Sequence, residues 1–137
     1  MKIQSIQTGL PRVLRFRGRE ISTGIFKKPV PGPIFVGTLN LDGDGQADLT
    51  VHGGRDKAVY AYSSDAYSGW SDIRPHDAFE GGAMGENLTV DHLPEDRLHI
   101  GDTFKIGGAV LQVTQPRLPC YKLAAKFNDP QIIRQFI

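Results

Sequence analysis

The sequence contains very little sulfur. Cys120 is the only cysteine among 137 residues, and there are two methionines. A single cysteine cannot form a disulfide within the chain, which excludes a small disulfide-stapled fold and agrees with a reducing compartment. A zinc centre is also disfavoured, because no second cysteine is present and the histidines are not spaced as ligands. These histidines are His52, His76, His92 and His99.

Long hydrophobic runs and an excess of charge of either sign are absent as well. No stretch approaches the about 18 consecutive apolar residues that cross a bilayer, and the amino terminus lacks the basic and then apolar pattern of a signal peptide. Lys and Arg number 16 against 15 Asp and Glu, for a net charge of +1, which argues against a surface that coats nucleic acid. We therefore expect a cytoplasmic protein with neither a membrane nor a nucleic acid as partner.

Short segments between turn residues dominate what is present. The chain has 16 glycines and 9 prolines, and the runs between them carry β-branched or apolar residues in rough alternation, which is typical of strands. Gly107 and Gly108 separate two such runs and predict a hairpin, because glycine reaches positive φ without steric cost. Strands are expected in the segments SIQTG, IFVGTLNL, ADLTVHGG, ENLTV, DTFKIGG and AVLQVTQP.

Helical patterns are fewer. Residues 55–72 place Ala58, Tyr62 and Ala66 at fourfold spacing, which indicates a helix over part of that segment. Near the carboxyl end, Asp129 followed by Pro130 favours a helix start. That pattern is still apolar where the chain stops, so either the helix docks on the fold as its last element or the polypeptide belongs to something longer. With no repeat or linker, we expect one mainly β domain, a closed β-barrel or sandwich with one or two short helices.

An acidic, glycine-rich loop spans residues 40–48. Asn40, Asp42, Asp44 and Asp48 are spaced like oxygen ligands around calcium. An EF-hand is excluded, because the twelfth position of such a loop is Gly53 instead of a bidentate glutamate. The alternative interpretation is a polar turn between two strands.

Two cationic segments have the composition of anion contacts. Gly53 and Gly54 lie between an expected strand and an expected helix, so free backbone N–H groups are predicted at a helix start, where anions are favoured. In STGIFKKPVPGP, small hydroxyl residues and a glycine precede two lysines. An ordinary turn with solvated charges is the alternative in both cases. The further donors in the two segments are His52, Arg55 and Lys57, and Thr23, Gly24, Lys27 and Lys28.

The segment TQPRLPCYKL places Cys120 directly after Pro119, with Arg117 and Lys122 close on either side. Neighbouring cations, with His52 as a third candidate, stabilise a thiolate, which is the form that acts as nucleophile or metal ligand. The two prolines fix the backbone around it. A free cysteine is also among the most frequently buried residues and packs as a small hydrophobe. The residues alone leave both interpretations open.

Four segments taken together resemble a MOSC domain, the carboxy-terminal domain of molybdenum cofactor sulfurase, in its stand-alone YiiM-like branch. They are STGIFKKPV, GDGQADLTVHGGRDKAVYAY, GENLTV followed by IGDTFKIGGAVLQVTQPRLPCYKL, and FNDPQIIRQF. The resemblance covers nearly the whole chain and implies a single MOSC domain over residues 1–137, built around a closed β-barrel. It turns the acidic loop into a family turn. YiiM-like proteins usually continue past the last segment with further strands and a small helical domain, which are missing here.

The resemblance also implies a function. It predicts a molybdenum-cofactor (molybdopterin) oxidoreductase that reduces small N-hydroxylated compounds of the hydroxylaminopurine type. Cys120 would be the catalytic residue and the metal ligand. A redox partner protein is expected, and a homodimer is considered. The residues predicted to bind the cofactor are Thr23, Gly24, Lys27, Lys28, His52, Gly53, Gly54, Arg55, Lys57, Asn87 and Arg117.

Two alternatives stay open beside this reductase. The first is a carrier of sulfur or cofactor that uses Cys120. The second is a non-catalytic ligand-binding β-barrel with a calcium loop at Asn40–Asp48.

Overall fold

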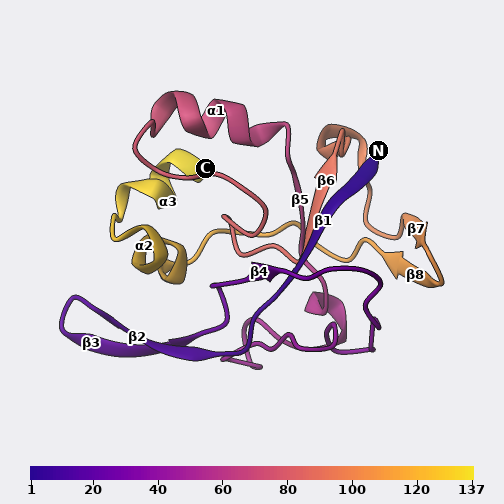
Figure 1. Cartoon of the computed structure of the whole chain (residues 1–137), viewed down its shortest axis with the longest axis horizontal. Helices are drawn as coiled ribbons and strands as arrows, with labels where there is room; N and C mark the ends of the chain where they lie inside the picture. The colour runs from indigo at the N-terminus through magenta and orange to yellow at the C-terminus, as the bar shows by residue number, and fades with distance from the viewer.

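The largest sheet has four strands in the order β4-β1-β6-β5 (Figure 1). Its members are β1 (Lys2–Thr8), β4 (Lys28–Pro29), β5 (Ala61–Ser63) and β6 (Leu88–Asp91). Strand β1 is antiparallel to β4 and β6, whereas β5 is parallel to β6. The first three residues of the inner strand β6 are all buried, as expected for a strand with a neighbour on each side. This computed structural model describes residues 1–137.

Two hairpins lie outside this sheet. Strands β7 (Thr103–Ile106) and β8 (Ala109–Gln112) pair in antiparallel register around Gly107, which has a φ of 57°. This confirms the predicted hairpin. Strands β2 (Arg12–Phe16) and β3 (Arg19–Thr23) form a second hairpin that the sequence patterns did not reveal. Its two turn residues, Arg17 and Gly18, both have positive φ, as a tight two-residue hairpin turn requires.

The expected closed barrel is not found. The strands form one open sheet and two separate hairpins, so β4 and β5 each pair with one neighbour only. Two predicted strands are wrong: residues 34–41 make a single bridge between Val36 and Leu41, and residues 47–54 form bends and turns. Glycine explains part of this, since Gly43 and Gly54 adopt positive φ and interrupt extended backbone.

Three α-helices and two short 3₁₀ turns complete the fold. The helix predicted within residues 55–72 is confirmed only as α1 (Ala66–Ile73), because Tyr62 lies in β5 and η1 (Arg55–Lys57) is a 3₁₀ turn. The other 3₁₀ turn is η2 (Glu95–Arg97). Helix α2 (Tyr121–Phe127) was not predicted. Helix α3 (Gln131–Phe136) was, and the Asp129 carboxylate accepts a hydrogen bond from the Gln131 N–H at 2.9 Å.

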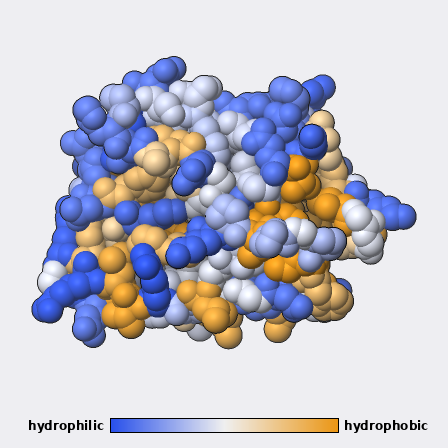
Figure 2. Space-filling model, in the orientation of Figure 1, coloured by the Kyte–Doolittle hydropathy of each residue, from blue (hydrophilic) through white to orange (hydrophobic).

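The core lies where the three helices meet the loop before β6. Trp70 stacks on Phe79 with ring centroids 5.7 Å apart, and Phe79 stacks on Phe127 at 5.6 Å. Figure 2 shows hydrophilic side chains interspersed with apolar patches on the outer face, without one continuous apolar band. No helix is long and apolar enough to cross a membrane. The core cluster comprises Tyr62, Tyr67, Trp70, Ala83, Met84, Leu123, Ala124 and Ile132.

A buried carboxylate organises the loop that leads into β6. Glu86 is fully buried and accepts hydrogen bonds from the N–H groups of Gly82 at 2.8 Å and Met84 at 3.0 Å. The hydroxyls of Thr89, at 2.9 Å, and Tyr67 donate to it as well. Burial and the nearby Glu86 raise the pKa of Tyr67, so its hydroxyl keeps the proton that it donates. This carboxylate therefore fixes the chain immediately before Asn87.

Candidate functional site

One open cleft of about 520 Å³ brings together most of the predicted site residues. Its volume is within the range of small-molecule sites. The lining comes from the end of β3, the turn around η1, the chain before β6 and the segment before α2. The predicted residues that line it are Thr23, Gly24, Lys27, His52, Lys57, Asn87, Arg117 and Cys120. Residues that were not in the predicted set also line it, namely Ile25, Gly45, Gln46, Ala47, Tyr60, Gly85 and Lys122.

The segment that carries Cys120 is held against the η1 turn by side chains. The Thr114 hydroxyl donates to the Asp56 carbonyl oxygen at 2.7 Å, and the Gln115 amide donates to the same oxygen at 3.3 Å. These bonds connect parts of the chain nearly 60 residues apart. They bring Arg117 and Cys120 into one cleft with His52 and Lys57.

Asp44 forms a polar knot behind the cleft. Its buried carboxylate accepts hydrogen bonds from the Gly9 N–H at 2.9 Å, the Asn87 amide at 2.9 Å and the Lys27 ammonium. Asp42 of the same loop is exposed. The loop therefore does not gather its carboxylates around an ion, and the calcium interpretation has no support in the geometry. A buried ion pair with Lys27 takes the place of a metal.

Asn87 and Gly24 have structural roles that their prediction as cofactor ligands did not anticipate. The Asn87 amide donates to the Gln7 carbonyl at 3.2 Å as well as to Asp44, and its oxygen accepts from the Tyr60 N–H at 3.1 Å. Its side chain is thus fully used within the protein. Gly24 packs against the acidic loop so closely that a Cβ there would lie 2.3 Å from the Gly45 oxygen.

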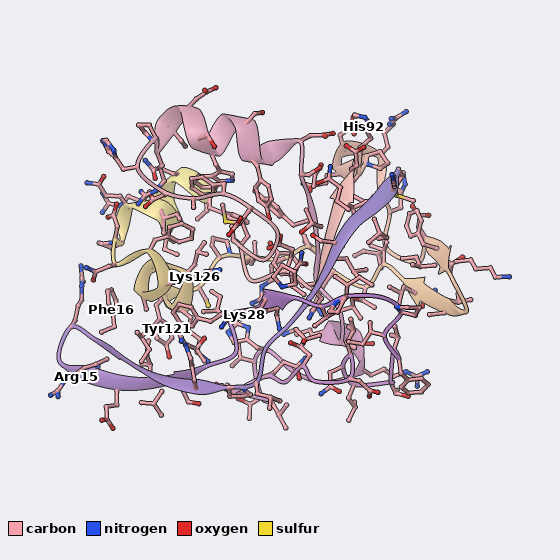
Figure 3. All side chains as sticks on the ribbon, in the orientation of Figure 1. Arg15, Phe16, Lys28, His92, Tyr121 and Lys126 are labelled. Atoms are coloured by element: carbon pink, nitrogen blue, oxygen red, sulfur yellow. The ribbon has the colours of Figure 1, made fainter.

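Four predicted residues do not line the cleft: Lys28, Gly53, Gly54 and Arg55. Lys28 is an exposed residue of β4 that pairs with Thr8 of β1 (Figure 3). The strand and helix expected on either side of the two glycines are absent, because residues 47–54 form turns and η1 has three residues. A Cβ on Gly53 would lie 2.5 Å from the Leu49 side chain, so this glycine serves packing.

The cleft lining contains cations and no carboxylate. Lys27 is neutralised by Asp44, whereas His52, Lys57, Arg117 and Lys122 have no ion pair. Burial lowers the pKa of His52, and the nearby charges of Arg117, Lys122 and Lys57 lower it further. The imidazole is therefore held neutral at neutral pH by its cationic surroundings. An anion placed here would find several unpaired positive charges.

Cys120 forms part of the wall between two cavities. It is partly exposed and lines both the cationic cleft and a smaller apolar pocket beside Met84, Leu123 and Phe136. It is therefore not a packed core cysteine. Tyr60 lines both cavities too, and burial raises the pKa of its phenol, which stays protonated at neutral pH. The Arg117 guanidinium lies over the Tyr60 ring at 5.2 Å.

One other group of metal-binding side chains lies outside the cleft. The imidazole of His92 is 3.1 Å from the Asp65 carboxylate and 3.7 Å from that of Asp91. These residues follow β5 and β6, and in Figure 3 His92 lies at the opposite end of the molecule from the hairpin β2–β3. The group is mostly solvent-exposed and forms an ion-paired surface cluster when His92 is protonated.

The family model of the MOSC domain matches residues 48–137, which includes the η1 turn and the segment with Cys120. The chain belongs to the MOSC domain family. It is 44% identical to the uncharacterized protein YflK of Bacillus subtilis over 133 residues, which are 96% of this chain and 59% of YflK. The crystal structure of YiiM from Geobacillus stearothermophilus is similar with a TM-score of 0.75 and 36% identity, over 98% of this chain and 60% of that one.

A third relative is a protein of Gibberella moniliformis named reductase. It is 37% identical over 123 residues, which are 88% of this MOSC chain and 22% of the fungal protein. The chain thus spans less than two thirds of the length of these relatives. The family and the YiiM-like fold are shown by these similarities.

Lys122 and Tyr60 were missed as predicted site residues, for different reasons. Lys122 lies in the otherwise apolar run LAA of α2, and a lysine at a buried helical position is a signal that could have been used. Tyr60 has no such signal, because a tyrosine beside β5 is equally typical of a core position.

Proposed function

We propose that this MOSC chain binds the molybdenum cofactor in the cationic cleft and serves in the reduction of N-hydroxylated compounds, with Cys120 as the metal ligand. The observation that carries the proposal is the union of a partly exposed thiol with four unpaired cations in a lining without any carboxylate. Such a donor set fits a group that combines a soft metal with anionic phosphate. The fungal relative named reductase supports the redox class.

The residues of the chain would divide the work. Cys120 would ligate molybdenum through a thiolate that the surrounding positive charge stabilises. Lys57, Arg117 and Lys122 would bind the oxyanions of the cofactor. When bound, the cofactor supplies two-electron chemistry at molybdenum.

The reduction converts an N-hydroxyl compound into the parent amine and water, with the uptake of two electrons and two protons. The protein contributes orientation and fixed donors to this conversion. Tyr60 holds its proton at Oη because burial raises the pKa of the phenol, and it lines both cavities beside Cys120. His52 is neutral at neutral pH, so its ring offers one donor and one acceptor to a neutral substrate.

The test is an activity assay on the chain produced in a host that makes the pterin cofactor. With a chemical electron donor, we expect conversion of a hydroxylaminopurine to the aminopurine by the wild-type chain and loss of that conversion in Cys120→Ser. Tyr121→Phe, at the exposed next residue of α2, is the matched control. Full conversion by Cys120→Ser would rule out the ligand role. Labile sulfane sulfur on Cys120 without conversion would favour the sulfur carrier instead.

A further inference from the structure

Lys122 is buried without a partner. It is 8% exposed, lies two residues after Cys120 in α2, and takes part in no ion pair and no side-chain hydrogen bond. Removing an ammonium group from water without compensation costs free energy. Proteins rarely retain such a charge for stability alone, so an external counter-charge is the natural explanation.

The other lysines near the cleft already have acceptors within the protein. Lys27 binds the Asp44 carboxylate, Lys57 donates to the Val51 carbonyl at 2.6 Å, and Lys126 donates to the Gly82 carbonyl at 2.5 Å. Lys122 alone among them has all its donors free. It is also the most buried lysine of the cleft lining that lacks a counter-charge.

The surroundings of Lys122 offer positive charge and no counter-ion. His52, Lys57 and Arg117 line the same cleft. The nearest acidic group that feels its charge is the exposed Asp48, whose carboxylate is bound by the hydroxyl and N–H of Thr50. Asp48 is outside the cleft lining. The positive field inside the cleft is therefore left for a ligand to balance.

We propose that Lys122 is the main anchor of an oxyanion subsite that binds a phosphate group in this cleft, assisted by the guanidinium of Arg117. The subsite deepens the proposed function, because the phosphate of the pterin cofactor is one source of such a group and the phosphate of a small phosphorylated substrate is another. Binding of the oxyanion itself requires neither molybdenum nor the thiol.

The experiment uses the full chain purified from a host that cannot make the cofactor, titrated calorimetrically with inorganic phosphate and with pyrophosphate in a low-salt buffer free of phosphate. We expect Lys122→Met to weaken pyrophosphate binding at least about tenfold, since hydrogen bonds to a charged group are roughly twice as strong as neutral ones. Lys105→Met, at an exposed lysine of β7, is the matched control and keeps wild-type affinity. Lys122→Arg retains most of the binding.

The melting temperature separates a binding role from a structural one. Methionine fills nearly the same volume without charge, so Lys122→Met is expected to melt at the wild-type temperature or above it. Wild-type affinity in Lys122→Met would overturn the proposal, as would the absence of pyrophosphate binding by the wild-type chain. A large fall in melting temperature for both Lys122→Met and Lys122→Arg would overturn it too, because the lysine would then serve the fold.

Two further arms distinguish the source of the phosphate. If the source is the cofactor, the chain from a host that makes it binds pyrophosphate more weakly, because the subsite is filled. If the source is a phosphorylated substrate, that chain binds a nucleoside monophosphate more tightly than inorganic phosphate. Pyrophosphate binding that depends on Lys122, in a chain that retains no molybdenum, would leave the subsite standing and refute the proposed reductase.

Discussion

The properties of Cys120 follow from its position between two unlike surfaces. On one side are Met84, Leu123 and Phe136, and on the other are the unpaired cations of the cleft. An apolar wall disfavours a thiolate, whereas nearby positive charge favours it. A charged reagent can tell which influence is stronger, because it samples the field at the sulfur directly.

We predict that iodoacetate, which is anionic, alkylates Cys120 faster relative to neutral iodoacetamide than it does a small neutral thiol. The positive cleft concentrates the anionic reagent. The excess should shrink as ionic strength rises from about 0.01 M to about 0.15 M, because the Debye length falls from about 30 Å to about 8 Å. Rates are measured by mass spectrometry of the folded chain.

Arg117→Gln is the diagnostic variant for this experiment, and Arg134→Gln at an exposed position of α3 is its control. The first should lower the iodoacetate preference and the second should leave it unchanged. A preference that is absent, or that does not respond to salt, would mean that the cations do not act on the sulfur.

At the scale of elements, the acidic loop is a support for the cleft instead of a metal site. Asp44 ties the loop to Gly9 near β1, to Lys27 after β3 and to Asn87 before β6. Asn87 continues the connection to the chain before β5 through the Tyr60 N–H. Three walls of the cleft therefore depend on one buried carboxylate.

We predict that Asp44→Ala lowers the free energy of unfolding by about 3–5 kcal/mol, because it leaves the buried Lys27 ammonium without its partner. Asp42→Ala in the same loop, at an exposed position, should change it by no more than about 0.5 kcal/mol. Urea denaturation measures both. Added calcium should leave the wild-type midpoint unchanged. Equal stability of the two variants, or stabilisation by calcium, would restore the calcium interpretation.

Elements whose signal is local could be predicted from the sequence. The hairpin β7–β8 has a Gly-Gly turn, and α3 has Asp129 and Pro130 at its start. The hairpin β2–β3 escaped prediction because Arg17 occupies a positive φ that its side chain does not advertise. Residues 47–54 look extended by composition, but glycine and local side-chain bonds fold them into turns.

The candidate site could not be predicted from local patterns in the same way. Its cations come from segments joined by bonds such as that of Thr114 to the Asp56 carbonyl, which no spacing rule reveals. Resemblance to the MOSC family supplied the grouping. Residues such as Gly24 and Asn87 were then assigned to a ligand, although their close packing and internal hydrogen bonds hold the fold together.

At the scale of the whole molecule, an open sheet, two hairpins and three helices form a cleft in a chain shorter than its relatives. The chain matches 98% of its own length to a solved YiiM but only 60% of that protein. We propose that these residues are sufficient to hold the cofactor, since all the unpaired cations and the thiol belong to them. Closure of a barrel and a redox partner are expectations for the longer relatives.

The most direct test of the account is the molybdenum content of the purified chain, measured by mass spectrometry of the metal after production in a host that makes the cofactor. We predict stoichiometric molybdenum in the wild-type chain and in Lys105→Met, and little in Cys120→Ser. Circular dichroism should show the same fold for all three, because Cys120 borders a cleft and is not packed in the core. Molybdenum in Cys120→Ser at the wild-type level, or none in any of the three folded chains, would contradict the account.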